Sequence, residues 1–93
     1  MAYVYMLTND RGNVLYVGAT EDLKKRLCLH QGGFVAGFTK KYKVRRLVYF
    51  EKHGDIEAAR KRERFLKGKT REKKNKIIQD LNPTLSDLSS QIS

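Results

Sequence analysis

Three side chains with the chemistry to handle a phosphate group follow one another in the stretch from Val14 to His30. Tyr16 lies in an apolar, strand-like run, and Arg26 and His30 follow it, spaced four residues apart. Residues at that spacing lie one helical turn apart on the same side. An arginine fork can clamp a phosphate oxygen, and a histidine can relay a proton near neutral pH. This pattern favours phosphate chemistry, although His30 near a helix end could instead cap carbonyl groups. The other histidine, His53, is interpreted as a turn residue.

Tyrosines also occupy an earlier strand-like run, residues 2–8. Tyr3 and Tyr5 alternate onto one face of it, and Tyr16 lies in the run beyond the next turn. Packing is the ordinary explanation, because aromatic side chains fit pleated surfaces. A tyrosine with a pKa near 10 is only about 0.1% phenolate at pH 7, so a catalytic base would need a nearby cation such as Arg26. We favour Tyr5 as this base with His30 relaying its proton, and the exchange of roles between Tyr5 and Tyr16 stays open.

An acid interrupts the apolar stripe of a later helical segment. Ile56, Ala59 and Leu66 recur at helical spacing, and Glu63 falls on the same stripe. Three basic residues could form an ion pair with it: Arg60, Arg62 and Lys67. The functional alternative is a carboxylate that binds a divalent cation, since Mg²⁺ accepts oxygen ligands. One carboxylate suits a single ion that keeps most of its waters.

The charge of the chain is strongly positive and uneven. Twenty Lys and Arg against ten Asp and Glu give a net charge of +10, and residues 40–76 hold 16 of the basic and 5 of the acidic residues. Such a field favours a polyanion, and nucleic acid is the expected partner. The expected phosphate contacts are Lys40, Lys41, Lys67, Lys69, Arg71, Lys73 and Lys74. The alternative for the run at 67–76 is an ordinary solvated helix face.

Composition excludes several other classes of protein. No apolar run approaches the roughly 20 residues that span a bilayer, and no signal peptide is visible, so a cytoplasmic location without membrane contact is expected. Cys28 is the single cysteine, which excludes disulfide scaffolds and cysteine metal clusters. Ninety-three residues make one small domain, expected over residues 1–83, with a serine-rich tail at 84–93 that frays.

The pattern of apolar and turn residues predicts an α+β fold. Strands are expected at 2–8, 14–20 and 45–52, and helices from Thr20 to about 30, at 56–68 and from Thr70 to about 81. Thr20, Asp55 and Thr70 are the expected N-caps. The glycine-rich segment 31–42 is expected to be a loop pinned by two phenylalanines. This order, β-β-α-β-α-α, predicts a small central antiparallel three-stranded sheet flanked by helices, with the uncharged first strand in the middle.

Six separated elements in this order resemble one nuclease family. They are "YVYML", "LYVGAT" with the following "DL", "RL" and His, "FTKKY", "RLVYFE", "AARKRE" and "NP". The chain is similar over nearly its whole length to the GIY-YIG endonuclease domain, and most of all to its small stand-alone bacterial and archaeal members. It departs from the family name at Tyr3, where Gly would stand, and at Val4 and Val17, which replace Ile. Tyr3 adds bulk beside the expected site.

The resemblance implies hydrolysis of a phosphodiester bond that leaves 5′-phosphate and 3′-hydroxyl ends. It assigns catalysis to four side chains, Tyr5, Tyr16, Arg26 and His30. Glu63 would bind one divalent ion, Mg²⁺ or Mn²⁺. Gly18 would permit close backbone approach, and Asn82 matches the family's polar residue beyond the last helix.

Two functions follow from these patterns. The first is a metal-dependent DNA endonuclease, selective for structures such as flaps, branches or nicks because so small a domain buries too little surface to read a long sequence. Such selectivity would suit DNA repair or recombination. The alternative is a DNA- or RNA-binding protein with little or no turnover. A ribosome-associated or other structural protein is a third interpretation that rests on size and charge alone.

Overall fold

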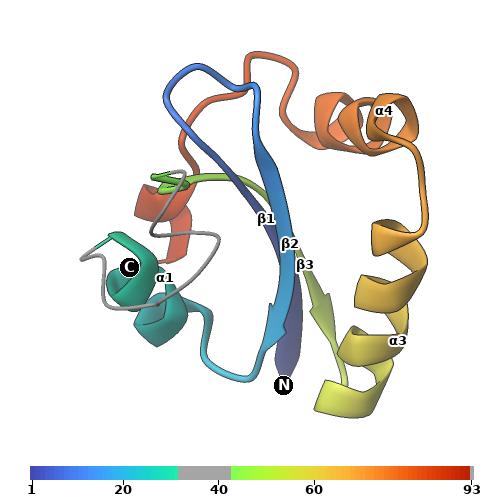
Figure 1. The fold of residues 1–93 in the computed structure, drawn as a ribbon. Coiled ribbons are helices and arrows are strands. Elements are labelled where there is room, and N and C mark those ends of the chain that lie inside the picture. Colours follow the sequence, from blue (N-terminus) through green and yellow to red (C-terminus); the bar gives the residue numbers. More distant parts are fainter. Residues whose placement is uncertain (32–42, 93) are drawn as a thin grey trace.

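The computed structural model describes residues 1–31 and 43–92 and is built on one small sheet (Figure 1). Strands β1 (Ala2–Thr8), β2 (Leu15–Thr20) and β3 (Arg46–His53) form an antiparallel sheet in the order β2-β1-β3. The uncharged β1 therefore lies in the centre, as its composition predicted. The α+β fold with a three-stranded antiparallel sheet is confirmed.

The register of the β1–β2 hairpin brings the motif residues together. Tyr5 pairs with Gly18, and Leu7 pairs with Tyr16. A tight turn sets this register: the Asn9 side chain accepts from the backbone N–H of Asn13, and Gly12 adopts a φ of 70°, which favours glycine. Between β1 and β3 the register shifts after Met6, because β3 carries a bulge there.

Helices cover both faces of the sheet. They are α1 (Leu23–Gln31), α3 (Ile56–Lys67) and α4 (Arg71–Leu81), with a short 3₁₀ turn, η1 (Ser89–Ile92), near the C-terminus. The caps predicted for α3 and α4 are confirmed: Asp55 accepts from the N–H of Ala58 at 2.8 Å and Thr70 from that of Lys73 at 3.2 Å. None of the helices in the described ranges is long and apolar enough to cross a membrane.

The start of α1 differs from the expectation. Thr20 is the last residue of β2, and its hydroxyl accepts from the N–H of Asp22 at 3.1 Å. The Asp22 carboxylate in turn accepts from the N–H of Lys25 at 3.0 Å, which makes Asp22 the N-cap. The helix therefore begins at Leu23, two residues later than Thr20 would have placed it.

The alternation of side chains along the sheet divides the core into two layers. Val4, Met6 and Val17 pack with Ala59 and Leu66 of α3 on one face. On the other face, the partners of Tyr5 and Leu7 come from α1 and the C-terminal segment: Leu23, Leu27 and Leu88. Figure 1 shows α1 and the C-terminal turn on one side of the sheet, with α3 and α4 on the other. This division decides which predicted site residues can meet.

The C-terminal segment packs against the sheet, which differs from the frayed tail expected at 84–93. The backbone N–H of Leu88 donates to the carbonyl of Leu47 at 2.7 Å, and the Leu88 side chain is buried. A guanidinium N–H of Arg46 donates to the carbonyl of Leu85 at 2.7 Å. The apolar contact of Leu88 and these two hydrogen bonds hold residues 85–88 on the face that α1 also covers.

Candidate active site

Two tyrosines from the hairpin form the centre of the candidate site. The rings of Tyr5 and Tyr16 lie with their centroids 6.1 Å apart at an interplanar angle of 45°. Tyr5 is fully buried, whereas Tyr16 is half-buried. Of the two tyrosines, only Tyr16 is partly open to solvent.

Gly18 makes this arrangement possible. A Cβ atom at position 18 would lie 2.6 Å from both Cζ and Oη of Tyr5 and 3.0 Å from Cε2 of Tyr16. Real Cβ atoms do not approach other atoms so closely, so only glycine leaves room for the Tyr5 ring. The resemblance implied that Gly18 permits close backbone approach, and in the structure the Tyr5 ring lies against this residue.

Arg26 reaches the tyrosines from α1. Leu23 and Leu27, each 3% exposed, anchor the helix on the sheet face that carries Tyr5, and Arg26 lies between them in sequence. The guanidinium interacts with both phenols. Its hydrogen bond with Tyr5 is the main cause that raises the pKa of Arg26, so the group stays a cation.

The electrostatics of Tyr5 oppose the base role that we favoured for it. Burial raises the pKa of Tyr5 well above its usual value of 10.0, and the hydrogen bond with Arg26 offsets this only in part. A buried phenol with a raised pKa holds its proton. Tyr5 is therefore suited to positioning Arg26.

One donor of Arg26 stands out. Its Nε is buried, and within the described part of the chain it has no hydrogen-bond partner. A buried donor without a partner costs roughly 1–3 kcal/mol. An incoming oxygen that accepted from Nε would recover this cost, so the arrangement favours a ligand with acceptor oxygens.

The neighbours of Arg26 on α1 complete this side of the site. His30 follows Arg26 by one helical turn and lies within α1, as the spacing predicted. Its side chain is outside the described positions, so its catalytic role stays a prediction. Cys28, the chain's single cysteine, is exposed on the same helix.

Glu63 lies on α3, which covers the opposite face of the sheet from α1. Its carboxylate forms an ion pair with Lys67, Oε2 to Nζ, at 2.8 Å, and 19% of its side chain is accessible. This is the ion pair that the sequence left open as the alternative to metal binding. The described residues contain no group of three or more His, Cys, Asp or Glu that could hold a metal ion. The donor set fits only a cation that brings most of its own water ligands.

Asn82 is buried, and its side chain holds the C-terminal segment in place. Nδ2 donates to the carbonyls of Val48 at 3.1 Å and Ser86 at 2.8 Å, and Oδ1 accepts from the N–H of Ser86 at 3.1 Å. These bonds join the end of α4 to β3. The residue supports the fold in this structure rather than facing the tyrosine pair.

The basic residues predicted to contact phosphates divide into three groups. Lys40 and Lys41 lie outside the described residues. Two others have close partners: Lys67 pairs with Glu63, and the Arg71 guanidinium donates to the carbonyl of Gly12 at 3.0 Å, which ties α4 to the hairpin turn. The rest lie on or just before α4 and are exposed or half-buried: Lys69, Lys73 and Lys74.

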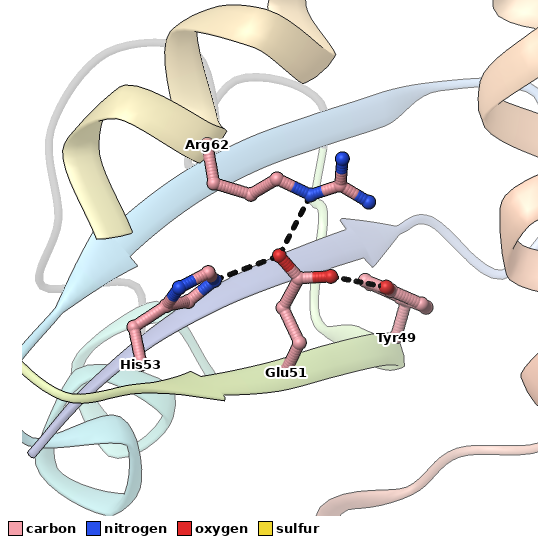
Figure 2. A network of polar contacts seen from close by, with 4 residues as sticks. All are labelled: Tyr49, Glu51, His53 and Arg62. Carbon is pink, nitrogen blue, oxygen red and sulfur yellow. Dashed lines mark hydrogen bonds and ion pairs between the residues drawn. The ribbon is translucent and has the colours of Figure 1, made fainter. Parts of the chain in front are cut away.

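Sequence reasoning missed a polar network on β3 and α3 (Figure 2). Glu51 accepts hydrogen bonds from the Tyr49 hydroxyl and from Arg62 Nε at 2.8 Å, and it lies 2.8 Å from His53 Nε2. His53 is thus the last residue of β3 and a member of this network, not only a turn residue. The alternation of Tyr49, Glu51 and His53 was the signal that could have identified it.

The network shifts two proton equilibria. Burial disfavours the charged form of Glu51 and so acts to raise its pKa. The hydrogen bonds with Tyr49, His53 and Arg62 outweigh this effect, and the pKa of Glu51 lies below its usual value of 4.5. Burial and the bond to Glu51 raise the pKa of Tyr49 to about 12. Glu51 is therefore a carboxylate at neutral pH that fixes Arg62 against β3.

Comparisons with known proteins agree with this fold. A model of the GIY-YIG catalytic domain matches residues 1–77. The UPF0213 protein CPE1444 of Clostridium perfringens is 37% identical over 78 residues, which cover 84% of this chain and 83% of that protein. A UPF0213 protein of Streptococcus sanguinis is 38% identical over 79 residues, covering 85% and 90% of the two chains. The solution NMR structure of the UPF0213 protein BH0048 from Bacillus halodurans matches with a TM-score of 0.59 and 28% identity, over 94% of this chain and 93% of that one.

Proposed function

We propose, from the premise that this chain belongs to the GIY-YIG catalytic domain family, that it is a divalent-metal-dependent endonuclease that hydrolyses phosphodiester bonds in DNA. Family membership supports a nuclease acting on nucleic acid. The metal, the choice of DNA and the selectivity for branched or nicked structures are our own extension. The single observation that carries the proposal is the buried, unpartnered Nε of Arg26 beside two phenols.

Arg26 binds the scissile phosphate in this proposal. Its charge neutralises a non-bridging oxygen as negative charge develops there, and its fork fixes the orientation of the phosphoryl group. The Tyr5 phenol supports this geometry through its hydrogen bond with Arg26. Lysine could supply the positive charge but not the paired hydrogen bonds that a guanidinium group forms with a phosphate.

Tyr16 is the better candidate for the base that activates water. It is half-buried, so water can reach it, whereas Tyr5 is fully buried and its pKa is raised by burial. His30, one turn further along α1, would accept the proton in turn.

Glu63 would hold the divalent ion in place of its ion pair with Lys67. When bound, the ion would supply positive charge to a nucleic-acid phosphate on the α3 side of the sheet, the face opposite the one that α1 and Arg26 cover. Its single carboxylate fits one hydrated Mg²⁺ or Mn²⁺ rather than a pair of ions.

A cleavage assay on Arg26 variants tests the function. Purified protein is incubated with branched, nicked and single-stranded DNA, with and without Mg²⁺ or Mn²⁺. We expect metal-dependent cutting by the wild type and a loss of about 100-fold or more in Arg26→Ala, because charge stabilisation at the phosphate is removed. Arg26→Lys should also be severely impaired. Lysine keeps the positive charge, but it cannot form the paired hydrogen bonds of the guanidinium group.

Controls separate catalysis from folding and binding. Lys25→Ala changes the exposed neighbour on the same helix and should cut at the wild-type rate. Glu63→Ala should no longer cleave DNA, although its affinity for DNA should stay unchanged. Full cleavage activity in this variant would show that Glu63 is not the metal ligand. If the wild type binds DNA or RNA in a salt-dependent manner and cuts no substrate, the alternative of a nucleic-acid-binding protein without turnover is correct.

A further inference from the structure

A hollow surface lined by residues of α3, α4 and β3 lies on the side of α3 and α4, which cover the face of the sheet opposite α1. Two adjoining hollows of about 270 and 520 Å³ share Ile77 and Asp80 in their lining. We call them together the α3–α4 groove, and define it by Phe65, Lys69, Lys73, Lys76, Ile77 and Leu81. The groove therefore combines apolar side chains with positive charge.

The apolar part of the groove is unusually open. Phe65 is 50% exposed and Leu81 is 54% exposed, although both lie on helices whose other exposed side chains are mostly polar or charged. Large exposed apolar side chains that share one groove are typical of a contact site. Burial of both side chains by a ligand would stabilise the complex.

The Phe65 ring is flanked by cations. Lys69 Nζ lies 4.4 Å from the ring centroid, and the Arg62 guanidinium carbon lies 5.3 Å from it. Glu51 fixes Arg62 through the 2.8 Å bond to Nε (Figure 2). The guanidinium is therefore held close to the Phe65 ring. Lys69, in the short connection between α3 and α4, has a long side chain that can move to a phosphate. Phe65 and Arg62 thus form a pre-organised stacking surface.

We propose that the α3–α4 groove binds an unpaired nucleotide of single-stranded DNA. Its base stacks on Phe65 against Ile77, and the adjacent phosphates contact Lys69, Lys73 and Lys76. Single-strand sites combine aromatic side chains with a positive groove in this way. The two hollows are lined by these three lysines and Arg62 against two acids, Asp80 and Glu51. Glu51 is paired with Arg62, and the chain has a net charge of +10, so a polyanion fits this lining better than an apolar peptide does. This inference extends the proposed function and rests on it for the choice of DNA as the ligand.

Binding of labelled single-stranded DNA without divalent metal tests the inference. Fluorescence anisotropy is measured for the wild type, Phe65→Leu and Phe65→Trp at one salt concentration. Stacking on an aromatic side chain predicts at least a fivefold weaker affinity in Phe65→Leu. Phe65→Trp should keep the affinity and lose indole fluorescence when DNA is added, and the chain contains no other tryptophan.

Duplex DNA of the same sequence is the first control, because its bases are covered. Phe65→Leu should change duplex affinity by less than about twofold. Lys73→Ala should weaken single-strand binding, whereas Lys61→Ala, an exposed lysine of α3 outside the groove lining, should weaken it less. Equal effects of Phe65→Leu on both kinds of DNA would overturn the stacking mode.

The outcomes separate this inference from the proposed function. If the wild type binds and cuts DNA while Phe65→Leu binds single strands unchanged, the groove is not the site and the nuclease proposal stands. If the wild type binds no nucleic acid, both fail. If Phe65→Leu instead converts a dimer to a monomer in sedimentation and leaves DNA affinity unchanged, the groove is a contact between two copies, which also overturns the inference.

Discussion

At the scale of single residues, Gly18 determines where the Tyr5 ring can lie. Tyr5 is fully buried because its ring passes over the backbone of its strand partner, Gly18. The phenol in turn interacts with Arg26, which places the guanidinium. The absence of a side chain at Gly18 is therefore a condition for the position of the cation.

Replacing Gly18 with alanine tests this dependence. The added Cβ would force the Tyr5 ring to move, which should cost about 1–3 kcal/mol of folding free energy and disturb Arg26. Urea denaturation and the cleavage assay measure the two effects. Gly54→Ala is the matched control, because a Cβ there would meet nothing within 4 Å. Equal stability of the two variants would contradict the argument.

The family resemblance pointed to Gly18 and Arg26, and the structure brings both residues next to Tyr5. Phosphate binding by Arg26 stays a prediction. The sequence did not predict the burial of Tyr5, since burial depends on α1 and on the third strand as well as on the hairpin. The burial of Tyr5 favours Tyr16 as the base, and this choice between the two tyrosines stays a prediction. The roles of His30, Glu63 and the lysines stay predictions, and the contacts assigned to Lys40 and Lys41 fall outside the described residues.

At the scale of elements, the Tyr49–Glu51–His53–Arg62 network joins strand β3 to helix α3. The strand supplies three of the four residues at alternate positions, and Arg62 comes from the helix eleven residues after Glu51. Alternation within a strand can be predicted from sequence. The pairing with Arg62 could not, because it depends on the angle at which α3 crosses the sheet.

The network predicts a pH dependence of stability. The folded-state pKa of Glu51 is lowered, so the stabilisation is present above the unfolded-state value of about 4.5 and is lost as the pH falls through the lower folded-state value. The difference in unfolding free energy between wild type and Glu51→Gln should be large at pH 7 and shrink near pH 3. Urea denaturation at both pH values measures it, with the exposed Glu21→Gln as control. A difference that stays constant would exclude this linkage.

At the scale of the whole molecule, the C-terminal segment closes the face that carries the tyrosines. Its position depends on hydrogen bonds to β3 and on Leu88, which the serine-rich local sequence did not reveal. The sheet order and the α+β class were predictable from periodicity along the chain. The packed tail was not, because its partner Leu47 lies far away in sequence.

Shortening Leu88 tests whether this segment stabilises the fold. Leu88→Ala removes a buried side chain and should lower the free energy of unfolding by about 2–3 kcal/mol. Leu81→Ala, at an exposed position, should change it by less than about 0.5 kcal/mol. Thermal and urea denaturation measure both variants. A tail that frays in solution would make the two indistinguishable.

The exposure of Cys28 on α1 has a practical consequence. Because it is the chain's single cysteine and lies two residues after Arg26, a maleimide dye or spin label can be attached at one defined point without any engineered substitution. Such a probe would report on any nucleic acid that approaches this helix. In the Phe65→Trp variant, energy transfer from the tryptophan to a dye on Cys28 would measure the distance between the two faces of the sheet.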